Sequence, residues 1–329
     1  MRPSWRSGSS LVVAAAAFVL TACLHAATGI GPDQAPGQGQ GQGKEQPQAA
    51  PPTAATPAAR QLIAAKAHLM DADYRADLAE LARWRDQAAL LDGDPGLGYL
   101  AHYWAGFASW RIAINGASHG MGRDDLKANL ERAETDFEAA IRLRDDDAEA
   151  YGAAAGVQGW LLVFLQDDPA AFRQVVASWK QHLTRALELA PNNARILWVE
   201  GGSIAFKPAA YGGDVQRGMQ IYRRAAEVAE APDPGSPQPD WGKPEALMSL
   251  AYFHLNQATP DLAAATEEAH AALRLRPDWS YVRDILLPMI EARRRQPAAT
   301  AAGPPATKPT QSTPAAPAAP AAPAVPPPG

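Results

Sequence analysis

Apolar side chains between residues 59 and 296 recur at spacings of three and four, which is the period of an amphipathic helix. No convincing run of alternating β-branched residues interrupts this pattern. Turn-forming stretches divide it, among them GDPG at 93–96, NGASHGMG at 115–122 and a proline-rich stretch at 232–239. We therefore expect an all-helical body of eight to ten helices.

A short motif recurs within this body: a small residue, a larger one four positions later, and a small one after three more. Such positions share one helical face, and the small ones allow a neighbouring helix to pack closely. After two of the copies the helix is expected to stop at Pro191 and at Pro277. The motif occurs as Ala133–Phe137–Ala140, in degenerate form as Trp179–Leu183–Ala186, and as Gly218–Tyr222–Ala225 and Ala265–Ala269–Ala272.

This helix-turn-helix arrangement resembles the tetratricopeptide repeat (TPR) family over roughly residues 75–295. The resemblance implies an all-α, TPR-like superhelix of antiparallel helix pairs. Successive copies lie further apart than the family's roughly 34 residues, so helices are lengthened or loops inserted. We expect four pairs and a closing helix at 279–295. Segments such as RALELAPNNARILWVEGG also resemble a widespread group of bacterial secreted TPR-like proteins with no settled activity.

Two low-complexity segments flank the helical body at 59–296. Residues 27–58 consist mostly of Gly, Gln, Pro and Ala, and residues 297–329 mostly of Pro and Ala. Such compositions bury too little apolar surface to offset chain entropy, so we expect a disordered tether over 23–58 and a disordered tail over 297–329. The tail is either an inert extension or a spacer or handle for a partner.

The N-terminus has the layout of a secretory signal peptide, with two arginines before a ten-residue apolar run that is too short to span a membrane. Leu20-Thr21-Ala22-Cys23 resembles the bacterial lipobox, which implies cleavage after residue 22 and a lipid on Cys23. The alternative is an ordinary signal peptide with a chance cysteine. Because Leu24 replaces the acidic residue often linked to inner-membrane retention, we expect anchoring on the periplasmic side of the bacterial envelope, at the outer membrane rather than the inner.

Charge and cysteine content narrow the classes of partner. The formal net charge is -5, and no basic cluster occurs, which argues against nucleic-acid binding and against membrane contact other than through the lipid. With one cysteine, the chain forms no internal disulfide, so the fold must be stable on its core alone.

Catalytic motifs are missing from the sequence. Its seven histidines form no HExxH pair, no GxSxG nucleophile elbow is present, and the Gly-Gln repeats lack the lysine of a phosphate-binding loop. We therefore expect no catalytic residues, no metal and no cofactor, and do not expect an enzyme.

The segment 99–111, YLAHYWAGFASWR, concentrates aromatic side chains on one helix. Aromatic residues on two helical faces either fill the core alone or also line the concave surface that helical solenoids use for partners. The candidate partner-binding residues of this helix are Tyr103, Trp104, Trp110 and Arg111.

Two glycine-containing loops add one candidate residue each. His119 lies among glycines in NGASHGMG, where an imidazole either contacts a partner or sits in a plain helix connection. Tyr211 lies in KPAAYGGD, which is either a ligand-contacting loop or a tight connection with the tyrosine as its plug. In that loop Asp214 is placed to cap the helix that starts at Val215.

These observations favour a lipid-anchored periplasmic TPR-like scaffold that binds a protein or peptide partner in its concave groove. The alternative is a ligand-handling lipoprotein component of a binding-protein-dependent uptake system, which this chain resembles in layout. An enzyme ranks third.

Overall fold

The computed structural model describes residues 56–296, which form eleven α-helices and no strand. The predicted all-α fold is confirmed for this part of the chain. The predicted signal peptide, Cys23, nearly all of the tether and the tail lie outside the described residues. The helices are α2 (Pro57–Tyr74), α3 (Leu78–Ala89), α4 (Gly98–Ser118), α5 (Arg123–Leu143), α6 (Ala148–Leu161), α7 (Pro169–Leu189), α8 (Ala194–Ala205), α9 (Val215–Val228), α10 (Lys243–Asn256), α11 (Leu262–Leu275) and α12 (Leu287–Arg295).

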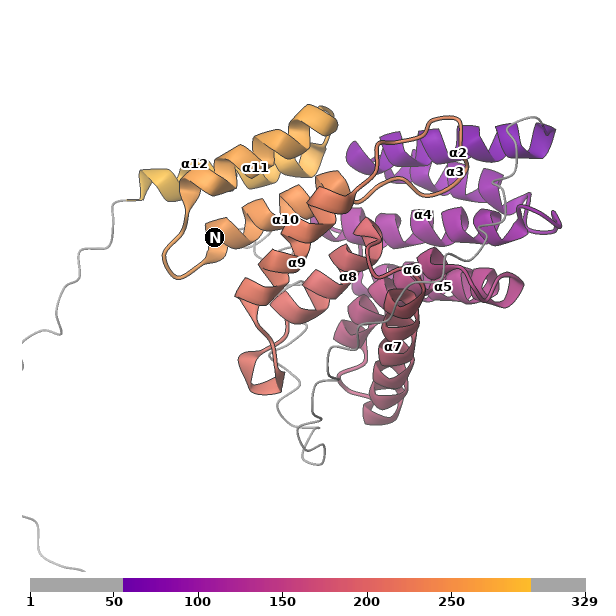
Figure 1. Cartoon of the computed structure of the whole chain (residues 1–329), viewed down its shortest axis with the longest axis horizontal. Helices are drawn as coiled ribbons and strands as arrows, with labels where there is room; N and C mark the ends of the chain where they lie inside the picture. Colours follow the sequence, from indigo (N-terminus) through magenta and orange to yellow (C-terminus); the bar gives the residue numbers. More distant parts are fainter. Residues whose placement is uncertain (1–55, 297–329) are drawn as a thin grey trace, which may run out of the picture.

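Consecutive helices pack as antiparallel pairs, and the pairs follow one another along a curved array (Figure 1). The pairs are α2/α3, α4/α5, α6/α7, α8/α9 and α10/α11, and a π-helical stretch, Tyr281–Leu286, leads into α12. The expected eight to ten helices were too few, because residues 57–74, which lie outside the TPR-like region, form the additional helix α2. None of the helices in residues 56–296 is long and apolar enough to cross a membrane.

Short polar side chains fix where many of these helices begin. The side-chain oxygen of each accepts a hydrogen bond from a backbone N–H in the first turn, which would otherwise lack a partner. The predicted cap at Asp214 is confirmed, since its carboxylate accepts from the Arg217 N–H at 3.0 Å. The capping residues are Thr56, Asp77, Asp147, Asp168, Asn193, Asp214 and Asp261.

The small positions of the repeated motif bring helices into close contact. Gly218 of α9 lies so near α8 that an added Cβ would come within 2.5 Å of the Ala205 Cβ. All members of the four copies are buried except Trp179 of α7, in the degenerate copy. The motif therefore marks the helix contacts, and its degenerate copy lies on α7, a 21-residue helix that buries only three residues.

Helices α4 and α7 have the same length of 21 residues but differ sharply in burial. Seventeen residues of α4 are buried, whereas α7 buries only His182, Leu183 and Ala186, all in its second half. Figure 1 shows α7 projecting from the array, while α4 lies inside it. The first half of α7 thus carries partly exposed apolar side chains, including Phe172 and Trp179.

The first described helix meets the end of the array. Tyr74, the last residue of α2, donates its hydroxyl to Glu245 of α10 at 2.6 Å, and its carbonyl accepts from the Ser280 hydroxyl at 3.3 Å. Trp279 packs edge-on against the Tyr74 ring at 5.0 Å, and the Arg276 guanidinium lies 4.8 Å above it. The array is therefore closed between α2 and the segment that leads into α12.

Candidate functional site

A proline-rich segment of the chain lies on the inner helices of the array. This segment, residues 229–242, joins α9 to α10 without regular secondary structure and is called the strap below. Figure 1 shows it leaving α9 and reaching across to α2 and α3 before it returns to α10. Its hydrogen bonds run to side chains of α2, α4 and α8. The strap occupies the surface where the sequence predicts a partner.

Lys66 of α2 holds the first half of the strap. Its ammonium donates to the carbonyls of Asp233 and Ser236, both at 3.0 Å, and to the Asp240 carboxylate at 2.5 Å. The lysine side chain is only 6% exposed, so these three acceptors replace the water that a charged group requires. The Asp240 carboxylate also accepts from the Asp233 N–H at 2.9 Å, which folds the strap around the ammonium.

Three aromatic side chains of α4 hold the second half of the strap. The Trp104 indole N–H donates to the Pro237 carbonyl at 2.8 Å. The Tyr99 hydroxyl accepts from the Gln238 amide at 2.9 Å, and the Tyr103 hydroxyl accepts from the Trp241 indole N–H at 3.0 Å. Burial raises the pKa of Tyr103 well above its usual value, so its hydroxyl keeps its proton. The polar edges of these rings thus follow the strap.

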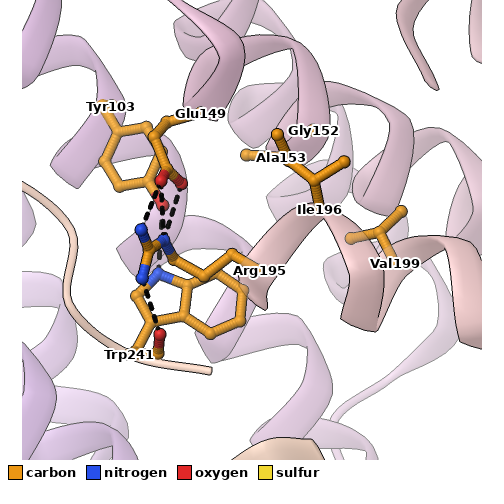
Figure 2. A pocket seen from close by; sticks show the side chains of 8 residues that line it. All are labelled: Tyr103, Glu149, Gly152, Ala153, Arg195, Ile196, Val199 and Trp241. Atoms are coloured by element: carbon orange, nitrogen blue, oxygen red, sulfur yellow. Dashed lines mark hydrogen bonds and ion pairs between the residues drawn. The ribbon is translucent and has the colours of Figure 1, made fainter. Parts of the chain in front are cut away.

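An ion pair between α6 and α8 fixes the end of the strap. Arg195 donates from Nε to both oxygens of the Glu149 carboxylate, at 2.7 and 2.8 Å, and from a terminal nitrogen at 2.6 Å. Another nitrogen of the same guanidinium donates to the Trp241 carbonyl at 2.9 Å. Figure 2 shows Arg195 between Glu149 and the strap, with the Trp241 ring beside Tyr103. One planar cation therefore joins two helices to the strap.

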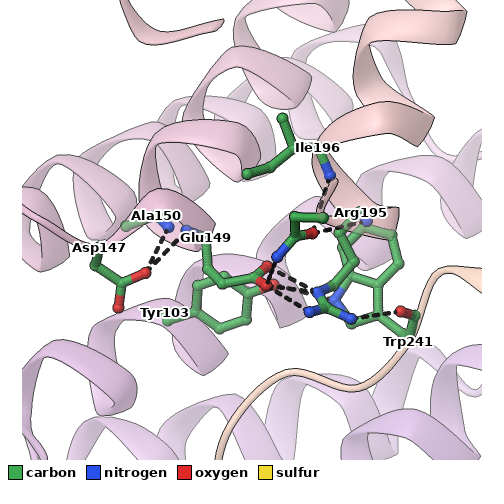
Figure 3. Close-up of polar contacts among 8 residues, drawn as sticks. Tyr103, Asp147, Glu149, Ala150, Arg195, Ile196 and Trp241 are labelled. Atoms are coloured by element: carbon green, nitrogen blue, oxygen red, sulfur yellow. Dashed lines mark hydrogen bonds and ion pairs between the residues drawn. The ribbon is translucent and has the colours of Figure 1, made fainter. Parts of the chain in front are cut away.

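Neighbouring caps complete the polar network (Figure 3). The Asn193 amide donates to Glu149 at 2.5 Å, while its oxygen caps α8. Asp147 caps α6 by accepting from the Glu149 and Ala150 N–H groups. Burial, reinforced by the Glu149 carboxylate, raises the pKa of Asp147 to about 6. Two helix starts are thereby tied to the ion pair that holds the strap.

The residues around Trp241 leave no space for a water molecule between them. Within residues 56–296, no group of histidine, aspartate and glutamate side chains is arranged to hold a metal ion. This site is suited to binding a chain segment by hydrogen bonds, because it has the donors and aromatic walls for that and no cavity for a small substrate.

The four predicted residues of α4 are all buried, at 5% exposure or less. Tyr103 and Trp104 lie under the strap, and Trp110 packs against Trp241 at a ring distance of 6.2 Å. Arg111 instead donates to the Asp73 carboxylate of α2 at 2.6 Å. None of the four lines an open groove, because the strap and α2 cover this face of α4.

The two loop candidates lie apart from the strap. His119 follows the end of α4, and its Nδ1 bonds to the Asn115 carbonyl at 2.8 Å, as expected of a helix connection. Tyr211 lies in the loop between α8 and α9 and is 39% exposed. The loop is tight because of Gly213, where an added Cβ would lie 1.7 Å from the Lys207 carbonyl oxygen.

Sequence reasoning missed the charged residues that hold the strap. Lys66 and Arg195 resemble surface cations in the sequence, and Glu149 a surface anion, because their partners lie far away in the chain. A usable signal was Trp241 directly after a proline-rich stretch, since a large apolar side chain in such a stretch needs a surface to cover it.

A second concave region lies at the α3–α4 connection and α5. It is an open depression of about 320 Å³ lined by Asp92, Gly93, His102, Ala139, Arg142 and Leu143. The His102 Nδ1 lies 3.1 Å from the Asp136 carboxylate, which orients the ring. This depression is shallow and open, and it lacks the converging hydrogen bonds of the strap site.

No protein-family model matches the sequence, and no curated protein matches it.

Proposed function

We propose that this protein is a lipid-anchored, TPR-like binding protein of the bacterial periplasm, and that its inner helices bind an extended segment of a partner protein. The observation that supports this proposal is the hydrogen bonding of the strap. Lys66, Trp104 and Arg195 all donate to main-chain carbonyls of an irregular segment. A surface with donors in this arrangement suits an extended peptide, whose carbonyls lack partners of their own.

The location of the partner is testable by photocrosslinking in living cells. Tyr99→p-azidophenylalanine places a reactive group of nearly the same shape at the edge of the strap, and Tyr211→p-azidophenylalanine places it on the exposed α8–α9 loop. We expect a covalent adduct with another protein from position 99 and none from position 211. An adduct only from position 211 would move the partner to the other loop, and no adduct from either would refute the proposed function.

The anchor is testable separately. Cys23→Ser removes the thiol that a lipid would modify, so the variant should lose palmitate labelling and leave the membrane fraction. Labelling that persists in Cys23→Ser would contradict the lipid anchor, while leaving the binding proposal to the crosslinking experiment.

A further inference from the structure

The strap is recognised partly through groups that any peptide carries. Four of its carbonyls, those of Asp233, Ser236, Pro237 and Trp241, accept from side chains of the inner helices. Proline is well suited to such a site, because it lacks an N–H and loses no hydrogen bond when only its carbonyl is used. Aromatic side chains that donate to the carbonyls of proline-rich segments are a recurrent mode of peptide recognition.

Two strap side chains add specificity. The Asp240 carboxylate is the only charged partner of Lys66 among the contacts of the described residues. Trp241 is 3% exposed and lies with its ring near Phe107, Trp110 and Trp198. Together with the buried Pro237 and Pro239 they give the pattern Pro-x-Pro-Asp-Trp, residues 237–241.

The two ends of the strap are held unequally. Residues 231–235 are exposed, and in this stretch the Asp233 carbonyl accepts from Lys66. Residues 237, 239, 241 and 242 are buried. The strap can therefore detach from its exposed end inward, and each detached residue that accepts a hydrogen bond from the inner helices leaves its donor without an acceptor. A replacement must supply acceptors at the same places, because a buried donor without a partner is costly.

We infer that the strap is a resident intramolecular ligand, and that the partner segment is an extended peptide with the pattern Pro-x-Pro-acid-aromatic, which binds by displacing it. This inference rests on the proposed function and names the ligand of the same site. A segment tethered at both ends is present at an effective concentration of the order of millimolar, so a free peptide competes poorly until the strap is weakened.

The test measures binding of a fluorescent peptide, APDPGSPQPDWG (residues 231–242), to the full chain in detergent by fluorescence anisotropy. Pro237→Gly/Pro239→Gly weakens the strap by raising the entropy of its free state, and leaves the inner helices unchanged. Asp240→Asn does so by removing the carboxylate that pairs with Lys66. We expect the peptide to bind at least tenfold more tightly to the double glycine variant than to the unaltered chain, and severalfold more tightly to Asp240→Asn.

Two controls separate specific from general binding. A peptide with Asn in place of Asp240 should bind the double glycine variant at least tenfold more weakly. Adding Lys66→Met to that variant should remove the difference between the two peptides. Circular dichroism checks that each variant remains helical.

The inference is overturned if both helical strap variants bind the peptide no better than the unaltered chain, or if the Asn peptide binds equally well. Its failure is distinguishable from failure of the proposed function. A partner crosslinked at position 99, without peptide binding, would keep the function and reject this ligand. Peptide binding without any crosslinked partner would reject the proposed function and keep the strap as an intramolecular ligand of this site.

Discussion

Helices α4 and α7 are equal in length, yet α4 is buried along nearly its whole length, whereas α7 has buried residues only in its second half. Helix α4 packs against α2, α3, α5 and α6, and the strap covers part of what remains. Helix α7 packs mainly on α6 and touches α8 near its C-terminal end. Membership of a helical array therefore does not by itself decide how deeply a helix is buried. The strap, an irregular segment distant in the sequence, covers α4. Within residues 56–296, no comparable segment covers the first half of α7.

The largest expected difference comes from removing an aromatic side chain from each helix. Trp104→Ala empties a fully buried site and removes the donor to the Pro237 carbonyl, so it should lower the free energy of unfolding by about 3–5 kcal/mol. Phe172→Ala, on the bare half of α7, should lower it by about 1 kcal/mol or less. Urea unfolding of both variants measures the difference, and equal losses would contradict the contrast between the two helices.

The next largest loss of stability is expected from removing the Lys66 ammonium, which lies under the strap. Lys66→Met leaves the Asp240 carboxylate and two carbonyls without their donor, and should lower the free energy of unfolding by about 2–3 kcal/mol. The matched control is Lys127→Met, which breaks an exposed pair with Glu131 and should change it by about 0.5 kcal/mol or less. If the two variants unfold at the same urea concentration, Lys66 contributes nothing measurable to holding the strap.

Replacing either of two glycines of α6 by alanine should change the stability by a smaller amount, with opposite signs at the two positions. At Gly156 an added Cβ would lie 2.6 Å from the Trp110 ring of α4, so Gly156→Ala should destabilise by about 1–3 kcal/mol. At Gly159 nothing lies within 4 Å, so Gly159→Ala should stabilise the helix by about 0.5–1 kcal/mol. Thermal unfolding should show shifts in opposite directions, and stabilisation by both variants would show that the face toward α4 is not tightly packed.

The last expected effect is a pH dependence of stability that comes from Asp147, next to the ion pair that holds the strap. Because the folded pKa of Asp147, about 6, exceeds its ordinary value, the protonated carboxyl favours folding. This contribution is present below pH 4 and is lost as the pH rises to about 6, with a size of up to about 3 kcal/mol. Asp147→Asn keeps a capping oxygen and removes the titration. Its stability relative to the unaltered chain should therefore rise between pH 4 and pH 7, and a constant difference would argue against the shifted pKa.

The sequence predicted the parts of this fold that depend on neighbours along the chain. The three-and-four spacing of apolar residues indicated the helices, and the repeated small residues indicated where they touch, as at Gly218. The poor burial of α7 also had a signal in the sequence, because Trp179 stands where the other copies of the motif carry a small residue.

The strap was not predictable in this way. Lys66 and Asp233 are 167 residues apart, and nothing in the neighbourhood of either residue specifies the other. The proline-rich stretch was interpreted as a joint between helices, which it also is. Likewise, the aromatic residues of α4 were expected to face either the core or a groove, and the choice depended on a segment whose position only the folded chain defines.

The meeting of α2 with the far end of the array has a consequence for the order in which the chain folds. The Tyr74 carbonyl and the Ser280 hydroxyl are separated by 206 residues, so α2, the first helix of the described residues, obtains this contact only after Ser280 has been synthesised. An open repeat array can grow one unit at a time, because each unit contacts only its neighbours. Here the closing contacts form only after a long loop has been brought together, which makes folding slower and more cooperative.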